Sequence, residues 1–485
     1  MSFLDGASWH GNISLNGWRP GGAGDAPVFE PATGKELGRT GRASVADVAE
    51  ASEVAAAAQK DWAALPYLVR SAVLRRAGQL FLDHTEELSD WIVRESGGIG
   101  PKAGLEIQTA GEECFEAAAL ASHPTGEILQ SALPRLSFSR RVPAGVVGVI
   151  APFNFPLILA IRSVAPALAL GNAVILKPDP RTAVSGGVLL ARIFEEAGLA
   201  QGLLSVLPGG ADVGEALVVD PRVRVIAFTG STKAGRQVGS LGAQHLKRVH
   251  LELGGNSALI VMNDVDLEKA VSVGAFGSFM HQGQICMTTG RHIVDARIAD
   301  DYAALLVEHA NHLPVGDPAS GQVALGPLID AVQRDRVHSI VTDTISQGAT
   351  LAAGGTYEEL FYRPTVLTNV PTSSPAYAEE VFGPVAPVVS YSSLDEAVAM
   401  ASASSYGLSL GILSGDGLRA LELASRITSG AIHINDQTVA DEAVIPFGGT
   451  GSSGNGSRVG GLANLDAYTE TQWVTAQSDL AIYPF

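Results

Sequence analysis

Cysteine is scarce in this 485-residue chain, which contains only Cys114 and Cys286. Two cysteines cannot form a disulfide framework, and their spacing is not that of a metal-ligand pair. Free thiols persist in a reducing compartment, so we expect a cytoplasmic protein. The run of residues 111–117 is typical of a helix, which favours a structural role for Cys114.

Positive charge is also in short supply, because 32 Lys and Arg residues face 50 Asp and Glu residues and the net charge is -18. A surface of this sign repels phosphate backbones and anionic lipids, so we expect no nucleic-acid partner and no membrane partner. A small ligand remains compatible, since its pocket can be locally basic. The histidines show no spacing typical of a ligand set, and we predict no metal ion.

The chain lacks the features of a secretion signal and of a membrane-spanning helix. No basic region followed by an apolar run lies near Asp5 and His10, so we expect no signal peptide. Residues 142–161 carry no charge and are long enough to span a bilayer. Pro143, Pro152 and Pro156 would break a lone lipid-exposed helix, so we interpret this stretch as a buried strand, a turn and a helix start.

The chain does contain short apolar runs that alternate with longer amphipathic ones. A helix is predicted over residues 44–65, opened by Ser44 and Asp47 in a pattern similar to a capping box. Strands separated by helix-length segments predict βαβ units and a parallel sheet, and a second α/β series follows from about residue 257 to about 446. The predicted strands cover residues 146–151, 173–176, 203–207, 223–228 and 249–253, and the helical segments include residues 182–197 and 231–243.

Three turns marked by glycine or proline carry side chains suited to covalent catalysis. Cys286 lies among small and polar neighbours, Glu252 ends an apolar run before two glycines, and Asn154 has a proline two residues away on either side. A nucleophile, a carboxylate and an amide together are typical of such a site. The residues alone leave alternatives open, namely a buried apolar cysteine and an asparagine that only shapes a turn.

Two glycine-rich segments compete as the phosphate-binding turn of a nucleotide site. Residues 449–454 match the GxGxxG pattern, but no regular strand leads into them and no amphipathic helix follows, so we interpret them as a loop. Residues 225–235 instead run from a buried strand through Gly230 and Ser231 into a helix, whose free N–H groups and dipole attract phosphate. On spacing alone, an ordinary βα turn is the alternative.

Taken in chain order, these segments resemble the aldehyde dehydrogenase superfamily over nearly the whole chain. The resemblance implies an α/β fold with a Rossmann-type cofactor domain, an α/β catalytic domain and a small β oligomerisation arm. The residues that carry it are Asn154, Lys177 before Pro178, Phe228-Thr229-Gly230-Ser231, Glu252, Cys286, Glu380-Val381-Phe382-Gly383-Pro384 and Pro446-Phe447-Gly448-Gly449.

The resemblance also implies domain boundaries. The NAD(P)-binding domain is expected to cover residues 1–122 and 144–254, and the catalytic domain residues 255–447. Residues 123–143 and 465–485 are expected to form the arm. An arm of this kind implies a homodimer or a homotetramer.

The chemistry implied by the resemblance is the oxidation of an aldehyde to its carboxylic acid by NAD or NADP. Cys286 adds to the carbonyl to give a thiohemiacetal, whose oxyanion accepts hydrogen bonds from the Asn154 amide and the Cys286 backbone N–H. Hydride transfer leaves a thioester, which water activated by Glu252 hydrolyses. We interpret His250 as a core or hydrogen-bonding residue.

The choice of cofactor depends on the segment after Lys177. Relatives that use NAD commonly have a glutamate three residues after this lysine, where this chain has Pro180. Loss of that carboxylate removes its repulsion of a 2′-phosphate and Arg181 adds attraction, so we predict that NADP is accepted as well as NAD. The resemblance places Glu380 against the nicotinamide ribose and Phe382 beside the ring. The predicted cofactor residues are Lys177, Pro180, Arg181, Gly230, Ser231, Gly235, Glu380 and Phe382.

For the substrate, residues 162–168, 177–182 and 454–458 resemble the benzaldehyde and vanillin dehydrogenase branch. We therefore favour an aromatic aldehyde, since apolar bulk near the thiol suits a flat ring, although plain core packing explains the same residues equally well. The predicted pocket residues are Phe279, Ile285, Met287, Arg162 and Phe447.

Three alternatives remain for the activity. An aliphatic or semialdehyde dehydrogenase would need a cation for a substrate carboxylate, and only Arg162 and Arg291 are candidates. A non-catalytic NAD(P)-binding protein would not need Cys286, Glu252 and Asn154 together. Thioester transfer to coenzyme A would use the same thiol without Glu252 as a water activator.

Overall fold

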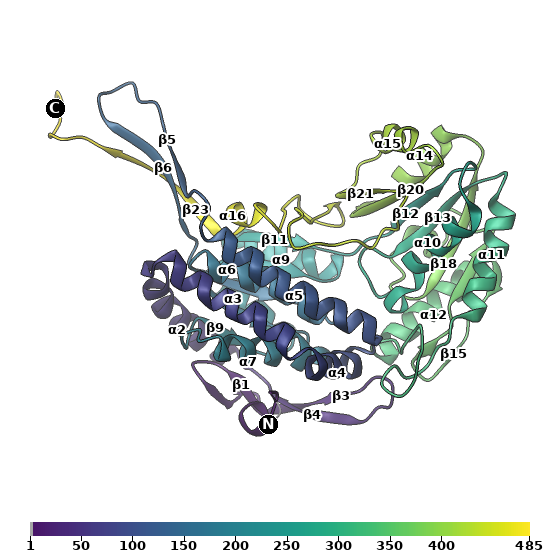
Figure 1. Cartoon of the computed structure of the whole chain (residues 1–485), viewed down its shortest axis with the longest axis horizontal. Coiled ribbons are helices and arrows are strands. Elements are labelled where there is room, and N and C mark those ends of the chain that lie inside the picture. Colours follow the sequence, from purple (N-terminus) through teal and green to yellow (C-terminus); the bar gives the residue numbers. More distant parts are fainter. Residues whose placement is uncertain (1–2) are drawn as a thin grey trace.

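The computed structural model describes residues 3–485 and consists of two α/β lobes with a β arm that projects from the first lobe (Figure 1). Among the described residues, each lobe is built around a seven-stranded sheet, and the arm is a separate three-stranded sheet. The fold is the α/β architecture that the sequence predicts. No helix in residues 3–485 is long and apolar enough to cross a membrane.

The first sheet has the order β11-β10-β7-β8-β9-β1-β2, and its strands pair in parallel from β11 to β9. The chain leaves β7 toward β8 and β9 and then returns to the other side of β7, so the connections change direction between β7 and β10. All five predicted strands are confirmed to within one residue at each end. The bounds are β1 (Asn12–Ser14), β2 (Trp18–Pro20), β7 (Val146–Ile150), β8 (Ala173–Lys177), β9 (Leu204–Val206), β10 (Val223–Thr229) and β11 (Arg248–Glu252).

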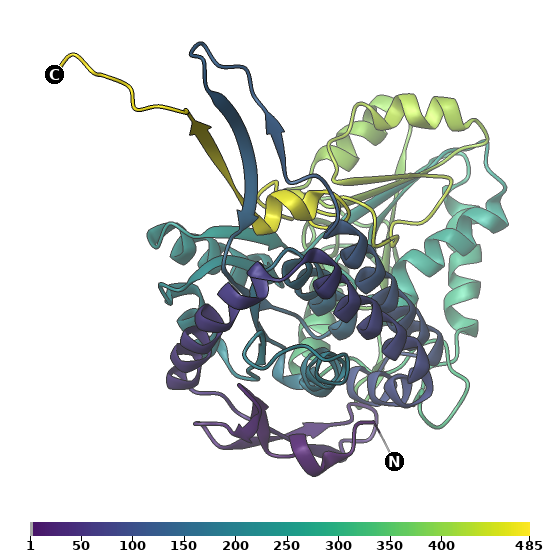
Figure 2. The same cartoon turned by 60° about the vertical axis from the view of Figure 1, so that its left-hand side comes forward.

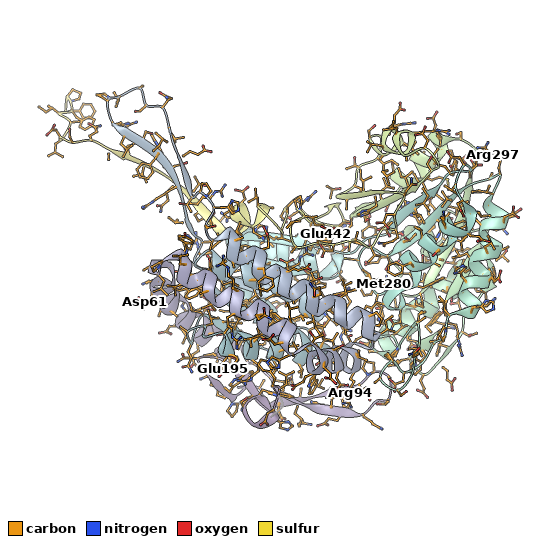
Figure 3. The ribbon with its side chains drawn as sticks, in the orientation of Figure 1. Asp61, Arg94, Glu195, Met280, Arg297 and Glu442 are labelled. Carbon is orange, nitrogen blue, oxygen red and sulfur yellow. The ribbon has the colours of Figure 1, made fainter. Side chains whose placement is uncertain are left out.

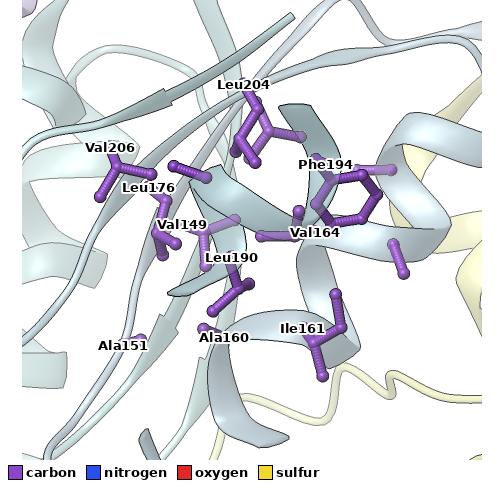
Figure 4. Packing of buried hydrophobic residues seen from close by; sticks show 14 of the residues in the cluster. Val149, Ala151, Ala160, Ile161, Val164, Leu176, Leu190, Phe194, Leu204 and Val206 are labelled. Carbon is purple, nitrogen blue, oxygen red and sulfur yellow. The ribbon is translucent and has the colours of Figure 1, made fainter. Parts of the chain in front are cut away.

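The helices of the first lobe cover this sheet, and aliphatic side chains fill the space between them. Figure 4 shows strand residues such as Val149 and Leu176 packed near Ile161 of α6 and Phe194 of α7. Burial of such side chains stabilises the fold by about 1.5–3 kcal/mol each. The bounds are α1 (Gly6–Trp9), α2 (Val45–Ala64), α3 (Tyr67–Asp83), α4 (Thr85–Ser96), α5 (Gly100–Leu120), α6 (Pro156–Ala169), α7 (Leu189–Glu196), α8 (Ala211–Val219) and α9 (Thr232–Gln244).

Two predicted helices have different outcomes. Helix α2 is confirmed with its capping box, in which the Ser44 hydroxyl accepts from the Asp47 backbone and the Asp47 carboxylate accepts from the Ser44 backbone. The helix predicted over residues 182–197 is instead a 3₁₀ turn (Pro180–Thr182), a π-helical segment (Val184–Val188) and α7. A Cβ at Gly187 would lie 2.8 Å from Pro178, so the glycine permits this wider turn to pack tightly.

The second sheet has the order β14-β17-β18-β13-β12-β20-β21, and only the β14–β17 pair is antiparallel. Its strands are β12 (Ser257–Val261), β13 (Thr289–Asp295), β14 (Thr350–Ala353), β17 (Thr365–Thr368), β18 (Val385–Tyr391), β20 (Ser409–Leu413) and β21 (Ala431–Ile434). Its helices are α10 (Leu267–Phe279), a 3₁₀ turn (Met280–Gly283), α11 (Ala299–His312), α12 (Ala331–Ser346), α13 (Pro375–Ala378), α14 (Leu394–Ser402) and α15 (Gly417–Ala424).

The arm joins two distant parts of the chain. Strand β6 (Leu136–Pro143) pairs with β5 (Gly126–Ile128) and, over its full length, with β23 (Thr469–Ala476), which follows α16 (Ala463–Tyr468). The arm extends away from both lobes (Figure 2). Small two-stranded pairings complete the fold, formed by β3 (Asp25–Phe29) with β4 (Glu36–Gly41), β15 (Tyr357–Glu358) with β16 (Phe361–Tyr362) and β19 (Tyr406–Gly407) with β22 (Thr450–Gly451).

Candidate active site

Four of the predicted site residues lie at one edge of the first sheet. Ile150 at the end of β7 pairs with Lys177 and with Phe228, and Thr229 at the end of β10 pairs with Glu252. The carboxyl ends of these parallel strands therefore meet at a single edge, where the connections change direction. Such an edge is where open α/β sheets bind ligands. Asn154 and Ser231 follow β7 and β10 at the same edge.

The second lobe faces this edge with the amino ends of its own strands. Cys286 precedes β13, and Glu380 and Phe382 precede the neighbouring β18. Figure 3 shows Met280 where the two lobes face each other, and Met280 packs with Cys286 against a shared apolar cluster. The candidate site therefore lies between the carboxyl edge of one sheet and the amino edge of the other.

The glycine pair after Glu252 permits the close approach of these segments. A Cβ at Gly255 would lie 2.3 Å from the Cys286 carbonyl oxygen, and one at Gly254 would lie 2.1 Å from Glu380 Oε2. The Gly255 N–H donates to Glu380 Oε1 at 3.0 Å. A side chain at either glycine would force the thiol loop or Glu380 to move.

The environment of Cys286 disfavours its charged form. The residue is half-buried, and lost hydration raises the pKa of its thiol to about 12, with further contributions from the charges of Glu380 and Glu252. Arg162 opposes this shift. The resting thiol is therefore protonated at neutral pH and must give up a proton before it can act as a nucleophile.

Glu252 is a buried carboxylate without a hydrogen bond in residues 3–485. Lost hydration raises its pKa to about 8, while Arg162 and Arg458 pull the pKa down and Asp441 pushes it up. A carboxylate with this pKa near neutral pH is suited to take a proton and return it. This behaviour fits the predicted general base.

Asn154 is physically connected to the loop that carries the thiol. Its amide Nδ2 donates to the Gln284 carbonyl at 2.9 Å, and Gln284 Oε1 in turn accepts from the Ile329 N–H at 3.1 Å. An amide group has two N–H donors, so the second is available for another acceptor. One hydrogen bond thus joins the Asn154 amide to the residue two positions before Cys286.

An apolar cluster surrounds the thiol. Predicted pocket residues Ile285, Met287 and Phe447 belong to it, and Cys286 packs against it. Phe279 does not belong to it, because its ring lies in the interior of the second lobe, so the pocket prediction for Phe279 is not supported. The other buried members, which the sequence analysis missed, are Phe155, Ile158, Leu159 and Leu408.

The two candidate arginines are both engaged within the protein. Arg162 is buried, pairs with Asp441 at 3.0 Å and stacks over the Phe447 ring at 4.5 Å. Arg291 donates to backbone carbonyl oxygens, including that of Asn256 at 3.0 Å. Asp441 thus already pairs with Arg162 and backbone carbonyls already bind Arg291, although Arg162 Nε has no hydrogen-bond partner in residues 3–485.

The cofactor edge contains a buried cation that lacks a carboxylate partner. The Lys177 ammonium is buried and donates to the Pro178 carbonyl at 3.2 Å, and lost hydration lowers its pKa. A buried ammonium with a single acceptor fits the hydroxyl or phosphate oxygens of a ligand. Ser231 caps α9 by accepting from the Ala234 N–H at 3.3 Å, and Gly235 packs so closely on Leu253 that a Cβ would lie 2.2 Å away. These residues fit a dinucleotide.

Arg181 is less free than the sequence suggests. It pairs with Asp179 at 2.8 Å and with Asp330 of the second lobe at 2.7 Å, and it lies over the Phe153 ring at 4.2 Å. Phe153 also packs edge-on against Phe382, with 5.9 Å between ring centroids. Arg181 therefore connects the two lobes, and it would have to leave Asp330 to hold a 2′-phosphate.

The GxGxxG segment contains the two-residue strand β22, which pairs with β19, so it is only partly the loop that the sequence predicts, and it lies beside the candidate site. The Leu253 N–H donates to the Ser453 carbonyl at 2.9 Å, and Thr232 Oγ1 donates to the Ser452 carbonyl at 2.9 Å. His250 is buried and its Nε2 lies 3.2 Å from the Ala467 carbonyl, so the hydrogen-bonding role is confirmed. No group of three potential metal ligands occurs within the described part of the chain.

Comparison with known proteins now identifies the family. The aldehyde dehydrogenase family model matches residues 18–474. The chain belongs to the aldehyde dehydrogenase family. Its resemblance to that family, drawn from motifs in the sequence, is thereby confirmed.

The relatives of this aldehyde dehydrogenase include enzymes named for aromatic aldehydes. It is 63% identical to a vanillin dehydrogenase of an Amycolatopsis species over 100% of both chains. It is 48% identical to a benzaldehyde dehydrogenase [NAD(+)] of Pseudomonas putida over 98% of both chains.

Solved structures of the same fold agree with this assignment. A salicylaldehyde dehydrogenase from Pseudomonas putida G7, solved with salicylaldehyde, matches with a TM-score of 0.94 and 34% identity over 98% of this chain and 99% of that one. An Escherichia coli enzyme described as NADP dependent matches with a TM-score of 0.94 and 31% identity over 97% and 99%.

Besides the apolar residues named above, two carboxylates of this aldehyde dehydrogenase escaped the sequence analysis. Asp441 pairs with Arg162 and influences both Glu252 and Cys286, yet nothing in its local sequence marks it. Asp330 caps α12 by accepting from the Gln333 N–H at 2.8 Å. Its cap pattern could have indicated a helix start, but not the ion pair with Arg181.

Proposed function

We propose that this aldehyde dehydrogenase oxidises an aromatic aldehyde of the benzaldehyde or vanillin type to its carboxylic acid, with NAD or NADP as the oxidant. The observation that carries the proposal is the thiol of Cys286 packed against the apolar cluster, with Asn154 held to the same loop. The names of the relatives at 63% and 48% identity support the aromatic substrate.

In the first step the Cys286 thiol passes its proton to Glu252, which releases it to solvent before hydrolysis, and the sulfur adds to the aldehyde carbon. The new oxyanion accepts hydrogen bonds from the free Asn154 N–H and from the Cys286 backbone N–H. A fixed donor of this kind lowers the barrier by about 3–4 kcal/mol. The apolar cluster excludes water around the ring, which strengthens these hydrogen bonds.

When bound, the oxidised nicotinamide supplies the hydride acceptor that turns the thiohemiacetal into a thioester. Lys177, Gly230, Ser231 and Gly235 would hold the dinucleotide at the sheet edge, and Glu380 and Phe382 would hold its reactive end. These last two face the Cys286 loop from the second lobe. Glu252 then takes a proton from water, which attacks the thioester and frees Cys286.

For the cofactor, we propose that both NAD and NADP are accepted. Pro180 is exposed and carries no charge, so nothing at its position repels a 2′-phosphate. Arg181 contributes only when it exchanges Asp330 for the phosphate. The named NAD(+) dependence of one relative and the NADP dependence of one solved structure support both cofactors.

Contacts in the structure argue against the three alternative activities. A semialdehyde carboxylate would find Arg162 paired with Asp441 and Arg291 bound to backbone carbonyls. Transfer to coenzyme A would leave Glu252 without a role, although it is buried beside the thiol. A non-catalytic binder would need neither residue.

The proposal includes the organisation of the chain. Residues 1–122 and 144–254 would bind NAD(P), residues 255–447 would form the catalytic domain, and residues 123–143 and 465–485 the oligomerisation arm of a homodimer or homotetramer. Exposed apolar residues on the arm, such as Ile128 and Trp473, support the arm as a subunit contact. Two free cysteines support a cytoplasmic location.

A substrate panel read by NAD(P)H absorbance tests this function. Benzaldehyde and vanillin should give kcat/KM values at least about tenfold above those of hexanal and succinic semialdehyde. The acid should form without coenzyme A. Equal efficiency for hexanal would refute the aromatic preference, and product formation only with coenzyme A would refute hydrolysis by Glu252.

A further inference from the structure

Residues 95–106, where α4 turns into α5, contact two segments of the candidate active site at once. This corner contains two fully buried glutamates, Glu95 and Glu106, and a buried lysine, Lys102. None of them follows a strand of either sheet, and none has a role in the chemistry proposed above. Buried charged groups are retained only where they are paired or hydrogen-bonded, so their partners are informative.

Glu106 holds the turn that carries Asn154. Its Oε2 accepts from the Leu157 N–H at 3.0 Å and from the Ile158 N–H at 3.4 Å, which are free donors in the first turn of α6. The side chain of the N-terminal cap residue of α6, Phe155, makes no capping hydrogen bond. Glu106 therefore caps α6 from another helix, α5. The first N–H group that it caps, that of Leu157, is three residues after Asn154 in the chain.

Lys102 completes the same arrangement. It forms an ion pair with Glu106 and a hydrogen bond with Ser96 Oγ at 3.2 Å, and its ammonium lies over the Phe155 ring at 4.6 Å. Phe155 immediately follows Asn154 in the chain. The pair thus contacts the chain just after Asn154, at the Phe155 ring and at the first N–H groups of α6.

The corner also holds the loop that leads to the thiol. Gln282 Nε2 donates to the Gly97 carbonyl at 2.7 Å, and His281 packs edge-on against Phe155 with 5.3 Å between ring centroids. His281 and Gln282 have positive φ angles of 47° and 55°, a strained conformation that needs support from its surroundings. The loop that leads to Cys286 thus contacts the corner at Gly97, separately from the hydrogen bonds of Glu106.

We propose that Glu106 is a positioning residue for the Asn154 amide, so that the corner 95–106 sets the geometry of the oxyanion site. This inference rests on the proposed role of Asn154. A shift of the amide by about 1 Å is enough to cost about 100-fold in rate. Loss of the carboxylate would release the first turn of α6, and Asn154 with it.

The test is a double-mutant cycle on the first turnover of the holoenzyme. Enzyme with saturating NAD is mixed with benzaldehyde, and the rate of the first NADH formation is measured for Glu106→Gln, Asn154→Ala and the double variant. We expect Glu106→Gln to slow this rate about tenfold and Asn154→Ala about 100-fold. The double variant should be no slower than Asn154→Ala, because Glu106 acts only through that amide.

Glu95→Gln is the matched control. Glu95 is equally buried and also accepts from two backbone N–H groups, those of Val184 and Ser185, but these begin the π-helical segment and not α6. Any loss of first-turnover rate in Glu95→Gln should therefore multiply with the loss in Asn154→Ala when the two substitutions are combined. The inference is wrong if the rate loss of Glu106→Gln multiplies with that of Asn154→Ala in the double variant. It is also wrong if Glu106→Gln leaves the first-turnover rate unchanged.

The outcomes separate this inference from the proposed function. An unchanged rate in Asn154→Ala alone would remove the role of Asn154 and with it the role of Glu106. A slow Asn154→Ala variant with a normal Glu106→Gln variant would overturn only the inference. If Glu106→Gln does not fold, Glu106→Asp keeps the charge beside Lys102, shortens its reach and enters the same cycle with the same criteria.

Discussion

At the scale of single residues, the site combines groups whose charged forms are disfavoured by burial. Burial raises the pKa values of Cys286, Glu252 and Glu380 to about 12, 8 and 7. The charges of Glu380 and Glu252 add to the burial that raises the pKa of the Cys286 thiol, so forming the thiolate is costly while both carboxylates are ionised. The chemistry therefore depends on moving protons between these groups and the substrate.

Cys286→Ala should abolish turnover, because no other thiol is near the site. NAD binding, measured by calorimetry, should stay within about twofold, since the predicted cofactor contacts do not involve the sulfur. Cys114→Ala is the control, as Cys114 is fully buried in α5 and should leave kcat nearly unchanged. Residual turnover in Cys286→Ala would exclude the covalent route.

Hydrolysis of the thioester should depend on pH through Glu252. The base form exists above its pKa, so the deacylation rate should rise about tenfold per pH unit below pH 8 and level off above it. Glu252→Gln should accumulate acyl-enzyme, seen as one added acyl mass, and should slow deacylation at least about 100-fold.

Glu113 provides the control for this pH profile. Burial raises its pKa to about 8 as well, but it lies on α5 without a proposed catalytic role. Glu113→Gln should keep the pH midpoint. If the midpoint disappears in Glu113→Gln but persists in Glu252→Gln, the titrating group is Glu113 and the prediction for Glu252 is wrong.

At the scale of elements, the site is built from residues at the end of each strand or just beyond it. The ends of β7, β8, β10 and β11 present Asn154, Lys177, Ser231 and Glu252 because parallel strands end at a common edge. The turn after β8 carries Pro180 and Arg181. Asp179 accepts from the Arg181 N–H at 3.0 Å and thereby starts a 3₁₀ turn whose first residue is Pro180.

Pro180→Glu should shift the cofactor preference toward NAD. A carboxylate at this position would repel the 2′-phosphate of NADP, so kcat/KM for NADP should fall at least about tenfold relative to NAD. Pro180→Gln has the same size without the charge and should change the ratio less than about twofold. Equal losses in both variants would point to the backbone and not to the charge.

At the scale of the whole molecule, the arm exposes apolar side chains that no other part of the same chain covers. Strand β5 exposes Ile128 with 79% of its surface accessible, and β23 exposes Trp473. Solvent-exposed apolar residues on a projecting sheet are typical of a surface that a second subunit covers.

Ile128→Glu should therefore weaken the oligomer. Size-exclusion chromatography with light scattering should show a smaller species than the parent protein, with an unchanged circular dichroism spectrum. Leu246→Glu is the control, because Leu246 is 92% exposed but does not belong to any of the three strands of the arm. Dissociation by Leu246→Glu and not by Ile128→Glu would place the subunit contact elsewhere.

The sequence by itself determined what depends on neighbouring residues. The strands around residues 146–253 could be predicted because each is a short apolar run between turns, and the capping box at Ser44 because its two partners are three residues apart. The family motifs, with Asn154, Glu252 and Cys286 in order, determined the reaction class. The π-helical segment at Val184 was missed, since the packing of Gly187 on Pro178 is not visible locally.

Only the tertiary structure decided which side chains meet across long distances in the chain. Arg162 pairs with Asp441 and Arg181 with Asp330, so two of the cations that the sequence offered to ligands already have carboxylate partners. Phe279 lies in a core away from the thiol, because helical position and not chain proximity determines what a ring contacts. Glu106 reaches the turn of Asn154 from another helix, a contact that no local pattern encodes.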